Sequence, residues 1–419
     1  MMEQCLVHLP SHGKTTIKMI QLPFGTPFTV MAKPVGAACN LRCKYCYYLE
    51  KGNFYKTSDS HLMNDESLEN FIKQYIASQP TQQVVFNWHG GEALIRPIGF
   101  YKKIVDLESK YANGREITNT IQTNATLLNE EWCAFFKENN WLVGVSIDGP
   151  KHLHDLYRKK PDGQSSFDSV MEGIDLLNRF QVDWNILATV NAANADYPLE
   201  TYRFLKSLGT PFIQFTPVVE RIKRDGFLAH QGDENIKLAD FSVKPQQWGN
   251  FMCKIYDEWV REDVGTIFVQ LFDATLANKM GVLSPVCTMA EECGSALAVE
   301  FNGDVFSCDH FVFPSYKLGN IHSKPLWQMS LSDKQKRFGN NKKSTLPKKC
   351  RECEFLWACH GECPRNRFVK TNEKGRFLNY LCEGYRMFFS YVSQDMEYMK
   401  KELEANRPPA NIMSLKNSV

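Results

Sequence analysis

The sequence lacks any apolar run long enough to cross a bilayer. Its first thirty residues also lack an uninterrupted apolar core followed by a small-residue cleavage site, which a secretory signal would contain. We therefore expect a soluble globular protein of the cytoplasm, with no membrane as a partner. A repeat of fixed period and a low-complexity tract are absent as well.

The sequence has almost no net charge. Its 49 lysines and arginines nearly balance its 47 aspartates and glutamates, which leaves a formal charge of +2. There is also no basic stripe with interleaved aromatic residues, so neither charge nor pattern favours binding to nucleic acid. We expect no nucleic-acid partner. The 419 residues, 43% of them hydrophobic, can bury a large core and suggest two or three domains.

Short β-rich runs alternate with helical periodicity between about Phe28 and Val219. This pattern predicts six strands joined by crossover helices, and hence an α/β fold with a parallel sheet, either open or curved into a partial barrel. In both arrangements ligands bind at the carboxyl ends of the strands. The loops that follow the first four predicted strands are CNLRCKYC, HGGE, QTNAT and SIDGP.

The composition changes after Val219. A polar stretch there predicts a long loop, and a helix is expected from about Gln246 to Glu262. From Cys287 onward, short segments and dense cysteines predict a small domain organised around metal instead of a large apolar core. We expect an N-terminal extension over residues 1–26, a barrel over 27–245, bridging helices over 246–286, a cysteine-rich domain over 287–397 and a tail over 398–419.

The 14 cysteines are concentrated in two regions. Three of them have the spacing Cys-x3-Cys-x2-Cys near the start, and eight crowd the last third of the chain. A reducing compartment disfavours disulfides, and clustered thiolates suit iron–sulfur clusters, zinc or copper(I). Zinc stays open for both regions on spacing alone, and a zinc-bound interaction module would be a different class of function. The isolated Cys5, Cys133 and Cys253 are expected to be ordinary thiols.

The first cysteine loop resembles the signature of the radical S-adenosylmethionine enzymes, with Tyr45 as the aromatic residue before the last cysteine. The resemblance implies that Cys39, Cys43 and Cys46 hold a [4Fe-4S] cluster whose open iron binds S-adenosylmethionine. Reductive cleavage of that cosubstrate then gives a 5′-deoxyadenosyl radical.

The same resemblance implies further contacts with S-adenosylmethionine. HGGEALI occupies the position of the motif that holds its amino group, with Gly90, Gly91 and Glu92, although Ala93 stands where the family has proline. Ser146 and Arg158 match residues that contact the ribose and carboxylate, and Ile213 is expected against the adenine. The alternatives are a solvated surface charge for Arg158 and core packing for Ile213.

The cysteines of the last third resemble the SPASM domain, including Gly303 between the second and third of them. The resemblance implies two auxiliary [4Fe-4S] clusters, three clusters in all, with no open iron in the auxiliary pair. The implied ligands of one are Cys287, Cys293, Cys308 and Cys363, and those of the other are Cys350, Cys353, Cys359 and Cys382.

From roughly Thr29 to about Glu397 the chain resembles the anaerobic sulfatase-maturating enzymes, on the segments KPVGAACNLRCKYCYYLEK, HGGEALI, IQTNATLL, SIDGPKHLHDLYR and CDHFVFPSYKLGNI. The resemblance implies hydrogen abstraction from Cβ of a sulfatase cysteine or serine, giving Cα-formylglycine, with S-adenosylmethionine consumed to 5′-deoxyadenosine and methionine. Asp309 matches the proposed base, and Tyr48 is expected to line the substrate pocket. A turn aspartate and an aromatic packed beside the cluster are the alternatives for these two.

The implied partners are a sulfatase polypeptide with a Cys/Ser-x-Pro-x-Arg-like motif and an electron donor such as flavodoxin or ferredoxin. The strongest rival function is a SPASM enzyme that forms a thioether or carbon–carbon crosslink in a ribosomally made peptide. It shares every iron ligand, so the cysteines cannot reject it. The residues around Tyr47, Tyr48 and Asp309 favour sulfatase maturation.

Overall fold

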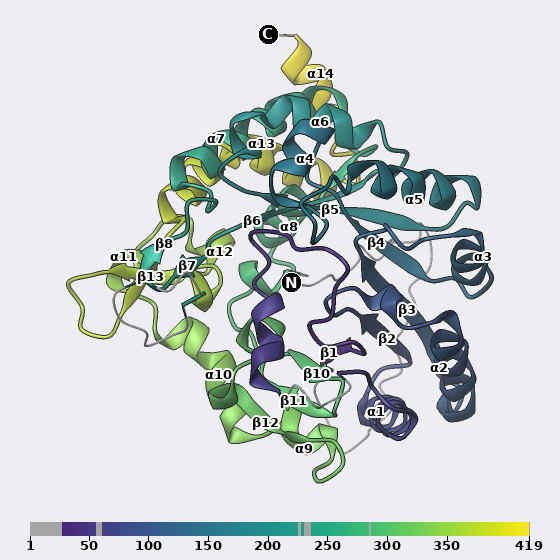
Figure 1. Cartoon of the computed structure of the whole chain (residues 1–419). Coiled ribbons are helices and arrows are strands. Elements are labelled where there is room, and N and C mark those ends of the chain that lie inside the picture. Colours follow the sequence, from purple (N-terminus) through teal and green to yellow (C-terminus); the bar gives the residue numbers. More distant parts are fainter. Residues whose placement is uncertain (1–26, 56–60, 225–227, 230–235, 285, 419) are drawn as a thin grey trace.

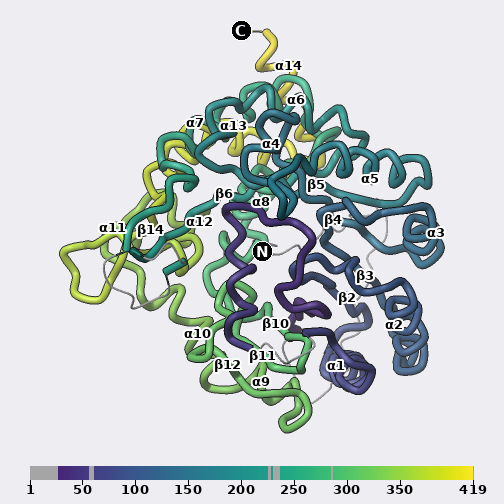
Figure 2. Tube along the Cα trace, viewed as in Figure 1, coloured from purple at the N-terminus to yellow at the C-terminus, as the bar shows by residue number. Residues whose placement is uncertain are grey.

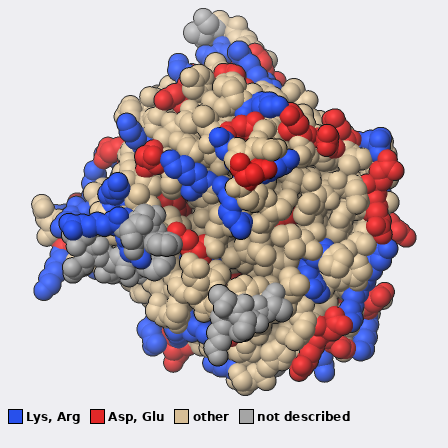
Figure 3. Space-filling model, viewed as in Figure 1, with Lys and Arg blue, Asp and Glu red and all other residues tan. Residues whose placement is uncertain are grey.

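The computed structural model describes residues 27–55, 61–224, 228–229, 236–284 and 286–418 of the chain, and the expected N-terminal extension over residues 1–26 lies outside them. Within these ranges no helix is long and apolar enough to cross a membrane. Acidic and basic side chains are interspersed over the face shown in Figure 3, in keeping with the small net charge.

A curved sheet of ten strands forms the centre of the molecule, in the order β12-β11-β10-β1-β2-β3-β4-β5-β6-β9 (Figure 1). The neighbouring pairs from β1 to β6 are all parallel. The six strands expected from the sequence are therefore present, and the α/β prediction is confirmed. They are β1 (Thr29–Lys33), β2 (Gln83–Trp88), β3 (Glu116–Thr123), β4 (Leu142–Ser146), β5 (Trp184–Val190) and β6 (Phe212–Pro217).

The crossover helices cover the outer face of this sheet (Figure 1). In the first of them one apolar face is buried, with Phe71 and Tyr75 packed against Phe86 of β2. Asn64 caps this helix by accepting a hydrogen bond from the backbone N–H of Ser67. The helices are α1 (Asp65–Ser78), α2 (Ile98–Tyr111), α3 (Glu130–Glu138), α4 (Lys151–Tyr157), α5 (Phe167–Arg179) and α6 (Pro198–Lys206).

The cysteine-rich segment adds three strands to the same sheet. β10 (Ala296–Glu300) pairs in parallel with β1, and β11 (Asp304–Phe306) and β12 (Lys317–Asn320) continue antiparallel. Figure 2 shows these green strands beside the purple start of the described chain. The apolar run of β10 covers the edge that β1 would otherwise expose. The strands of this segment thus contribute apolar side chains to the central core.

The remaining elements pack around the open side of the sheet. The predicted helix near Gln246 is present as α7, and α13 runs through residue 397, so no break marks the expected start of the tail; the domain boundaries stay a prediction. The helices are α7 (Pro245–Glu262), α8 (Gln270–Lys279), α9 (Leu326–Ser330), α10 (Asp333–Ser344), α11 (Lys348–Arg351), α12 (Leu356–Cys359), α13 (Cys382–Glu404) and α14 (Asn411–Asn417).

Short elements complete the described chain. The paired strands are β7 (Arg221–Ile222) with β8 (Lys237–Leu238), and β13 (Arg367–Lys370) with β14 (Phe377–Asn379), while β9 (Phe268–Val269) pairs with β6. The 3-10 turns are η1 (Leu49–Phe54), η2 (Ala93–Ile95), η3 (Asn194–Asp196), η4 (Cys287–Met289), η5 (Asp309–Phe311), η6 (Pro314–Tyr316) and η7 (Pro364–Asn366).

Helices α7 and α13 approach each other closely at Gly249 and Gly384. A Cβ on Gly384 would lie 2.2 Å from the carbonyl oxygen of Pro245, and one on Gly249 would lie 3.1 Å from Cα of Gly384. Small residues at this crossing let two backbones meet. The contact secures the helix that begins at Cys382 against the barrel.

We expect Gly384→Ala to lower the free energy of unfolding by about 1–3 kcal/mol, because the backbone it would strike cannot rotate away. The matched control is Gly99→Ala in α2, where nothing lies within 4 Å of the added Cβ. That change should be neutral or stabilising by up to about 1 kcal/mol, since alanine favours a helix. The midpoint of thermal unfolding of the anaerobically purified proteins measures both, and equal effects would contradict the close packing.

Candidate active site

A cavity of about 200 Å³ lies at the carboxyl ends of the parallel strands, where the sequence predicts the ligand site. The first cysteine loop forms one wall, and the cysteine-rich segment contributes to another. Cys39, Cys43 and Cys46 line the cavity together. The backbone N–H of Cys46 donates to the carbonyl of Cys43 at 3.0 Å, which keeps the loop tight.

The glycine loop after β2 packs on the backbone that leads into the cysteine loop. Gly91 donates its N–H to the carbonyl of Gly36 at 2.7 Å, and Glu92 donates to that of Ala38 at 2.8 Å. A Cβ on Gly91 would lie 2.0 Å from the Ala38 oxygen, so only glycine fits. Gly90 and Gly91 both line the cavity. Ala93, in the usual proline position, is buried in the core.

The side chain of Glu92 joins two loops. Its carboxylate accepts hydrogen bonds from Thr123 Oγ1 and the Asn124 backbone, both at 2.7 Å, and from the Leu94 backbone at 2.9 Å. Only 1% of Glu92 is exposed. The carboxylate therefore holds the ends of β2 and β3 in register, while the neighbouring glycines face the cavity.

Tyr45, Asp148 and Arg158 form a buried group behind the cysteine loop. Tyr45 donates its hydroxyl hydrogen to Asp148 and accepts from Arg158 Nη1 at 3.0 Å. Burial raises the pKa of Tyr45 well above its usual value, so the phenol stays neutral. Burial opposes the charge of Arg158, but Tyr45, Cys43 and Asp148 hold its pKa well above the usual value. Arg158 is 6% exposed and lines the cavity, which excludes the solvated surface charge.

Several polar atoms of the cavity have no hydrogen-bond partner within the described chain. Ser146 Oγ accepts from Gln122 Nε2 at 2.9 Å, and both residues line the cavity. Gln122 Oε1, Thr189 Oγ1 and Arg158 Nε are buried and unpartnered. Buried polar atoms normally find a partner, so these three fit a polar ligand in the cavity. Sequence reasoning missed Gln122 and Thr189, although both stand near the ends of predicted strands.

The structure does not bring Ile213 to the central cavity. Its side chain is 2% exposed, belongs to the hydrophobic core and lines a different cavity, so the predicted adenine contact is not supported and core packing accounts for it. The next residue, Gln214, does line the central cavity. The residues of β6 that line the central cavity are therefore those from Gln214 onward, toward the carboxyl end of the strand.

Asp309 and Lys33 form a buried ion pair beside the cavity. Lys33 Nζ lies 2.5 Å from Asp309 Oδ1, with Lys33 fully buried and Asp309 4% exposed. Tyr47 donates its hydroxyl hydrogen to the other oxygen of Asp309. Burial disfavours the carboxylate, yet charges led by Lys33 hold the pKa of Asp309 well below its usual range. Sequence reasoning missed Lys33, because lysine at a strand end is ordinarily exposed.

Tyr48 both lines the cavity and packs in a small apolar cluster, so its two expected roles coincide. Its hydroxyl donates to Glu300, and the Lys33 ammonium lies 4.2 Å from its ring centroid. His89 Nδ1 is 3.3 Å from Lys33 Nζ. The end of β1 thus carries a continuous polar network beneath the tyrosine pair.

The eight cysteines of the last third gather into two sets of four. One set lines a cavity of about 50 Å³ and the other a cavity of about 220 Å³, and each described cysteine is a free thiol. Burial and neighbouring thiols raise the pKa of Cys308 to about 12, so thiolates there need a bound cation. The sets are Cys287, Cys293, Cys308 and Cys363, and Cys350, Cys353, Cys359 and Cys382, as the resemblance implies.

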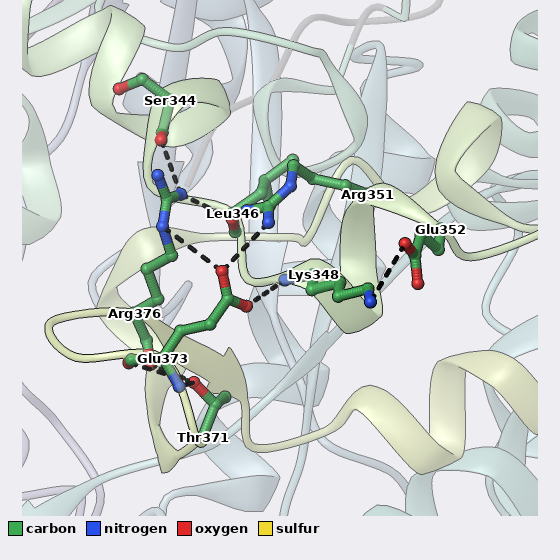
Figure 4. A network of polar contacts seen from close by, with 8 residues as sticks. All are labelled: Ser344, Leu346, Lys348, Arg351, Glu352, Thr371, Glu373 and Arg376. Atoms are coloured by element: carbon green, nitrogen blue, oxygen red, sulfur yellow. Dashed lines mark hydrogen bonds and ion pairs between the residues drawn. The ribbon is translucent and has the colours of Figure 1, made fainter.

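A network of polar contacts holds the loop of the second set (Figure 4). Glu373 accepts from the backbone N–H of Lys348 and pairs with Arg351 Nη2 at 3.0 Å. Arg376 donates to the carbonyls of Ser344 and Leu346 at 2.8 and 2.7 Å. These contacts tie the turn at residues 371–376 to the loop that presents Cys350 and Cys353.

Comparison with known proteins decides the family. The model of the Radical SAM superfamily matches residues 34–205, and that of the SPASM iron-sulfur cluster-binding domain matches residues 287–354. The chain is 58% identical over 396 residues to the serine-type anaerobic sulfatase-maturating enzyme of Bacteroides thetaiotaomicron, covering 93% of this chain and 95% of that protein. The chain belongs to the anaerobic sulfatase-maturating enzymes.

Two further relatives are a cysteine-type enzyme and a solved structure with bound ligands. The cysteine-type anaerobic sulfatase-maturating enzyme of Clostridium novyi is 32% identical, over 90% of this chain and 98% of that protein. The solved structure of native anSMEcpe with bound AdoMet and Cp18Cys peptide is 28% identical with a TM-score of 0.80, over 90% of this chain and all of that one. The cofactors of the family are S-adenosylmethionine and [4Fe-4S] clusters, and both cysteine cavities and the unpartnered polar atoms fit them.

We expect Lys33→Met to destabilise this sulfatase-maturating enzyme by about 3–5 kcal/mol, because it leaves the Asp309 carboxylate buried without its cation. Asp309→Asn alone leaves the Lys33 ammonium buried without its anion, with a similar cost. The double variant removes both charges, so it should lose clearly less than the sum of the two single losses. Thermal unfolding of the four proteins completes the cycle.

The exposed pair Lys44–Asp240, whose nitrogen and oxygen are 3.0 Å apart, is the matched control. Lys44→Met should cost under about 1 kcal/mol, since solvent screens an exposed pair. If the stability loss of the double variant equals the sum of the losses of Lys33→Met and Asp309→Asn, the two side chains do not interact and the ion pair is contradicted.

Proposed function

We propose that this enzyme oxidises an active-site serine of a target sulfatase to Cα-formylglycine, and a cysteine less efficiently. The observation that carries the serine preference is the 58% identity, across 95% of its length, to a relative described as serine-type. The cysteine-type relative is far more distant, at 32% identity. The proposed partner is a sulfatase polypeptide bearing a Cys/Ser-x-Pro-x-Arg-like motif.

The proposed site has three parts. Cys39, Cys43 and Cys46 would hold the first cluster, and the two sets of four cysteines would hold the auxiliary clusters. The glycine loop with Gly90, Gly91 and Glu92, together with Tyr45, Ser146 and Arg158, would hold S-adenosylmethionine. When bound, that cosubstrate supplies a 5′-deoxyadenosyl radical, which takes a hydrogen atom from the substrate Cβ. The first three cysteines, both glycines, Tyr45, Ser146 and Arg158 support these roles because they line the central cavity, and each set of four cysteines lines a cavity of its own. The buried Glu92 carboxylate contributes by holding the loop that carries the glycines.

Oxidation of a serine side chain to an aldehyde removes two protons and two electrons from the substrate. One of each leaves with the hydrogen atom from Cβ, so the hydroxyl proton needs a base and the last electron an acceptor. We assign the base to Asp309. Its ion pair with Lys33 and its bond from Tyr47 support this role, because they keep the carboxylate ionised and fix its direction. The auxiliary clusters, when bound, supply the redox capacity.

The rival crosslinking reaction has weaker support, because a relative that matches 93% of this chain at 58% identity is a sulfatase-maturating enzyme. We propose the cytoplasm as the compartment, since reducing conditions keep eleven cluster cysteines available as thiolates. Flavodoxin or ferredoxin is the proposed electron donor.

The proposal is tested by anaerobic reconstitution with iron, sulfide, S-adenosylmethionine and reductant, using matched sulfatase peptides with serine or cysteine at the target position. Mass spectrometry should show loss of two hydrogens from the serine peptide, and conversion of the cysteine peptide to the same aldehyde at a lower rate. An intramolecular crosslink, or an unmodified peptide beside normal cleavage of S-adenosylmethionine, would reject sulfatase maturation.

Asp309→Asn should reduce formylglycine formation by about 10²–10⁴-fold, the usual contribution of a general base. Because the substitution also leaves the Lys33 ammonium without its partner, formylglycine formation is compared per cluster-loaded enzyme, with iron content and peptide-independent cleavage of S-adenosylmethionine measured on the same sample. Asp240→Asn, at an exposed aspartate, is the control. Retained maturation by Asp309→Asn would remove the base assignment and leave the overall reaction intact.

A further inference from the structure

The central cavity shares part of its lining with a second, larger hollow of about 1190 Å³. This outer groove lies between η1, the β7–β8 hairpin and the β13–β14 hairpin. Its volume suits a segment of polypeptide, whereas the central cavity suits a small ligand. A side chain that reaches the central cavity from the outer groove must pass the residues common to both. We call these residues the neck: Tyr47, Val219, Glu220, His310 and Arg365.

The neck offers few free polar groups to a substrate. The Tyr47 hydroxyl is engaged by Asp309, and Glu220 and Arg365 form an ion pair with each other. His310 differs from them. Its Nε2 atom is buried and has no hydrogen-bond partner. Of the five neck residues, His310 is the one with a buried polar side-chain atom that forms no hydrogen bond.

The imidazole of His310 is held in place although Nε2 is unpaired. Its ring meets that of Tyr47 edge to face, with centroids 5.0 Å apart, and its backbone belongs to η5, directly after Asp309. A buried nitrogen without a partner costs free energy, and a ligand that supplies the missing hydrogen bond recovers that cost. The cavity beside His310 supplies the space for such a ligand.

We propose that His310 determines the preference for serine, by forming a hydrogen bond through Nε2 with the hydroxyl of the target side chain. This inference rests on the proposed function and names the residue behind its serine type. A hydroxyl is a strong donor and acceptor, whereas a thiol is weak in both roles. A site built around such a bond discriminates against a substrate that cannot form it, because the nitrogen is then left unpaired.

Because His310 directly follows Asp309, the proposed hydrogen bond would also orient the substrate hydroxyl. A hydroxyl held at the neck by His310 is presented on the side of the pocket where Tyr47 and Asp309 meet. The hydrogen bond therefore orients the oxygen whose proton must leave. A cysteine sulfur, larger and weakly bound, gains little from the same contact, so His310 favours serine in both binding and presentation.

The test compares His310→Phe and His310→Gln with the unaltered enzyme. Phenylalanine keeps the ring against Tyr47 and removes Nε2, while glutamine places an amide nitrogen near the position of Nε2. Each protein is given three peptides that differ only at the target residue, serine, cysteine or alanine. Peptide affinity is measured by calorimetry, and kcat/KM is measured for the serine and cysteine peptides.

We expect His310→Phe to lower kcat/KM for the serine peptide about 10- to 100-fold, the usual effect of losing one buried hydrogen bond. Its kcat/KM for the cysteine peptide should fall by less than about threefold on the same grounds. The unaltered enzyme should bind the serine peptide more tightly than the alanine peptide, and the phenylalanine variant should bind the two alike. His310→Gln should restore much of the serine preference.

Three controls keep the outcomes separate. Iron content and peptide-free cleavage of S-adenosylmethionine report whether the variants fold and load. His322→Phe, at a histidine bonded to Ser67 Oγ at 2.8 Å away from the neck, should change nothing in the serine-to-cysteine ratio. If the unaltered enzyme makes no formylglycine, the proposed function fails. If it does, and His310→Phe affects all three peptides equally or leaves the ratio unchanged, the role of His310 is overturned.

Discussion

The parallel pairing of β1 with β10 is the constraint on which the site depends. The two strands run in register from Thr29 opposite Ala296 to Lys33 opposite Glu300, so their carboxyl ends coincide. The chain leaves β1 into the first cysteine loop, and it leaves β10 through a hairpin strand toward Cys308. Two segments that lie some 260 residues apart in the sequence are thereby brought to one edge of the sheet.

The buried charges at this edge follow from that pairing. Lys33 and Glu300 are neighbours across the two strands, and each reaches a tyrosine or an acid of the adjoining loop. Buried charges cost desolvation, and they persist where partners compensate them. Here the compensation is mutual, because Lys33 faces Asp309 while Tyr47 and Tyr48 donate to the two carboxylates. The tyrosine pair therefore fastens the cysteine loop to the cysteine-rich segment.

The strand order of the barrel could be predicted from the sequence, whereas the pairing of distant segments could not. Alternating β-rich and helical runs predicted the six strands, their parallel order and the edge that holds the ligand loops. The grouping of the eight distant cysteines came from the resemblance, because spacing alone is compatible with several pairings and metals. The pairing of β10 with β1 could not be predicted, since an apolar run such as ALAVE carries no information about its neighbour.

Individual side chains were the hardest to predict. Lys33 was overlooked because its burial depends on Asp309, which lies far away in the sequence, and Ile213 packs in the core although the resemblance placed it against a ligand. His310 belongs to the segment CDHFVFPSYKLGNI, but the sequence assigned it no role, because whether a nitrogen is unpaired depends on the folded environment.

The Glu220–Arg365 ion pair connects two parts of the molecule at the neck. Glu220 follows β6 and Arg365 follows Cys363, so the pair joins the barrel to the cysteine-rich segment in the lining that the two cavities share. Arg365 also lies 4.8 Å from the ring centroid of Tyr47. The guanidinium is thus held from two sides, and the position of Tyr47 is coupled to both halves of the molecule. Because the same tyrosine contacts Asp309 and His310, the ion pair, the proposed base and the unpaired imidazole are linked through one side chain.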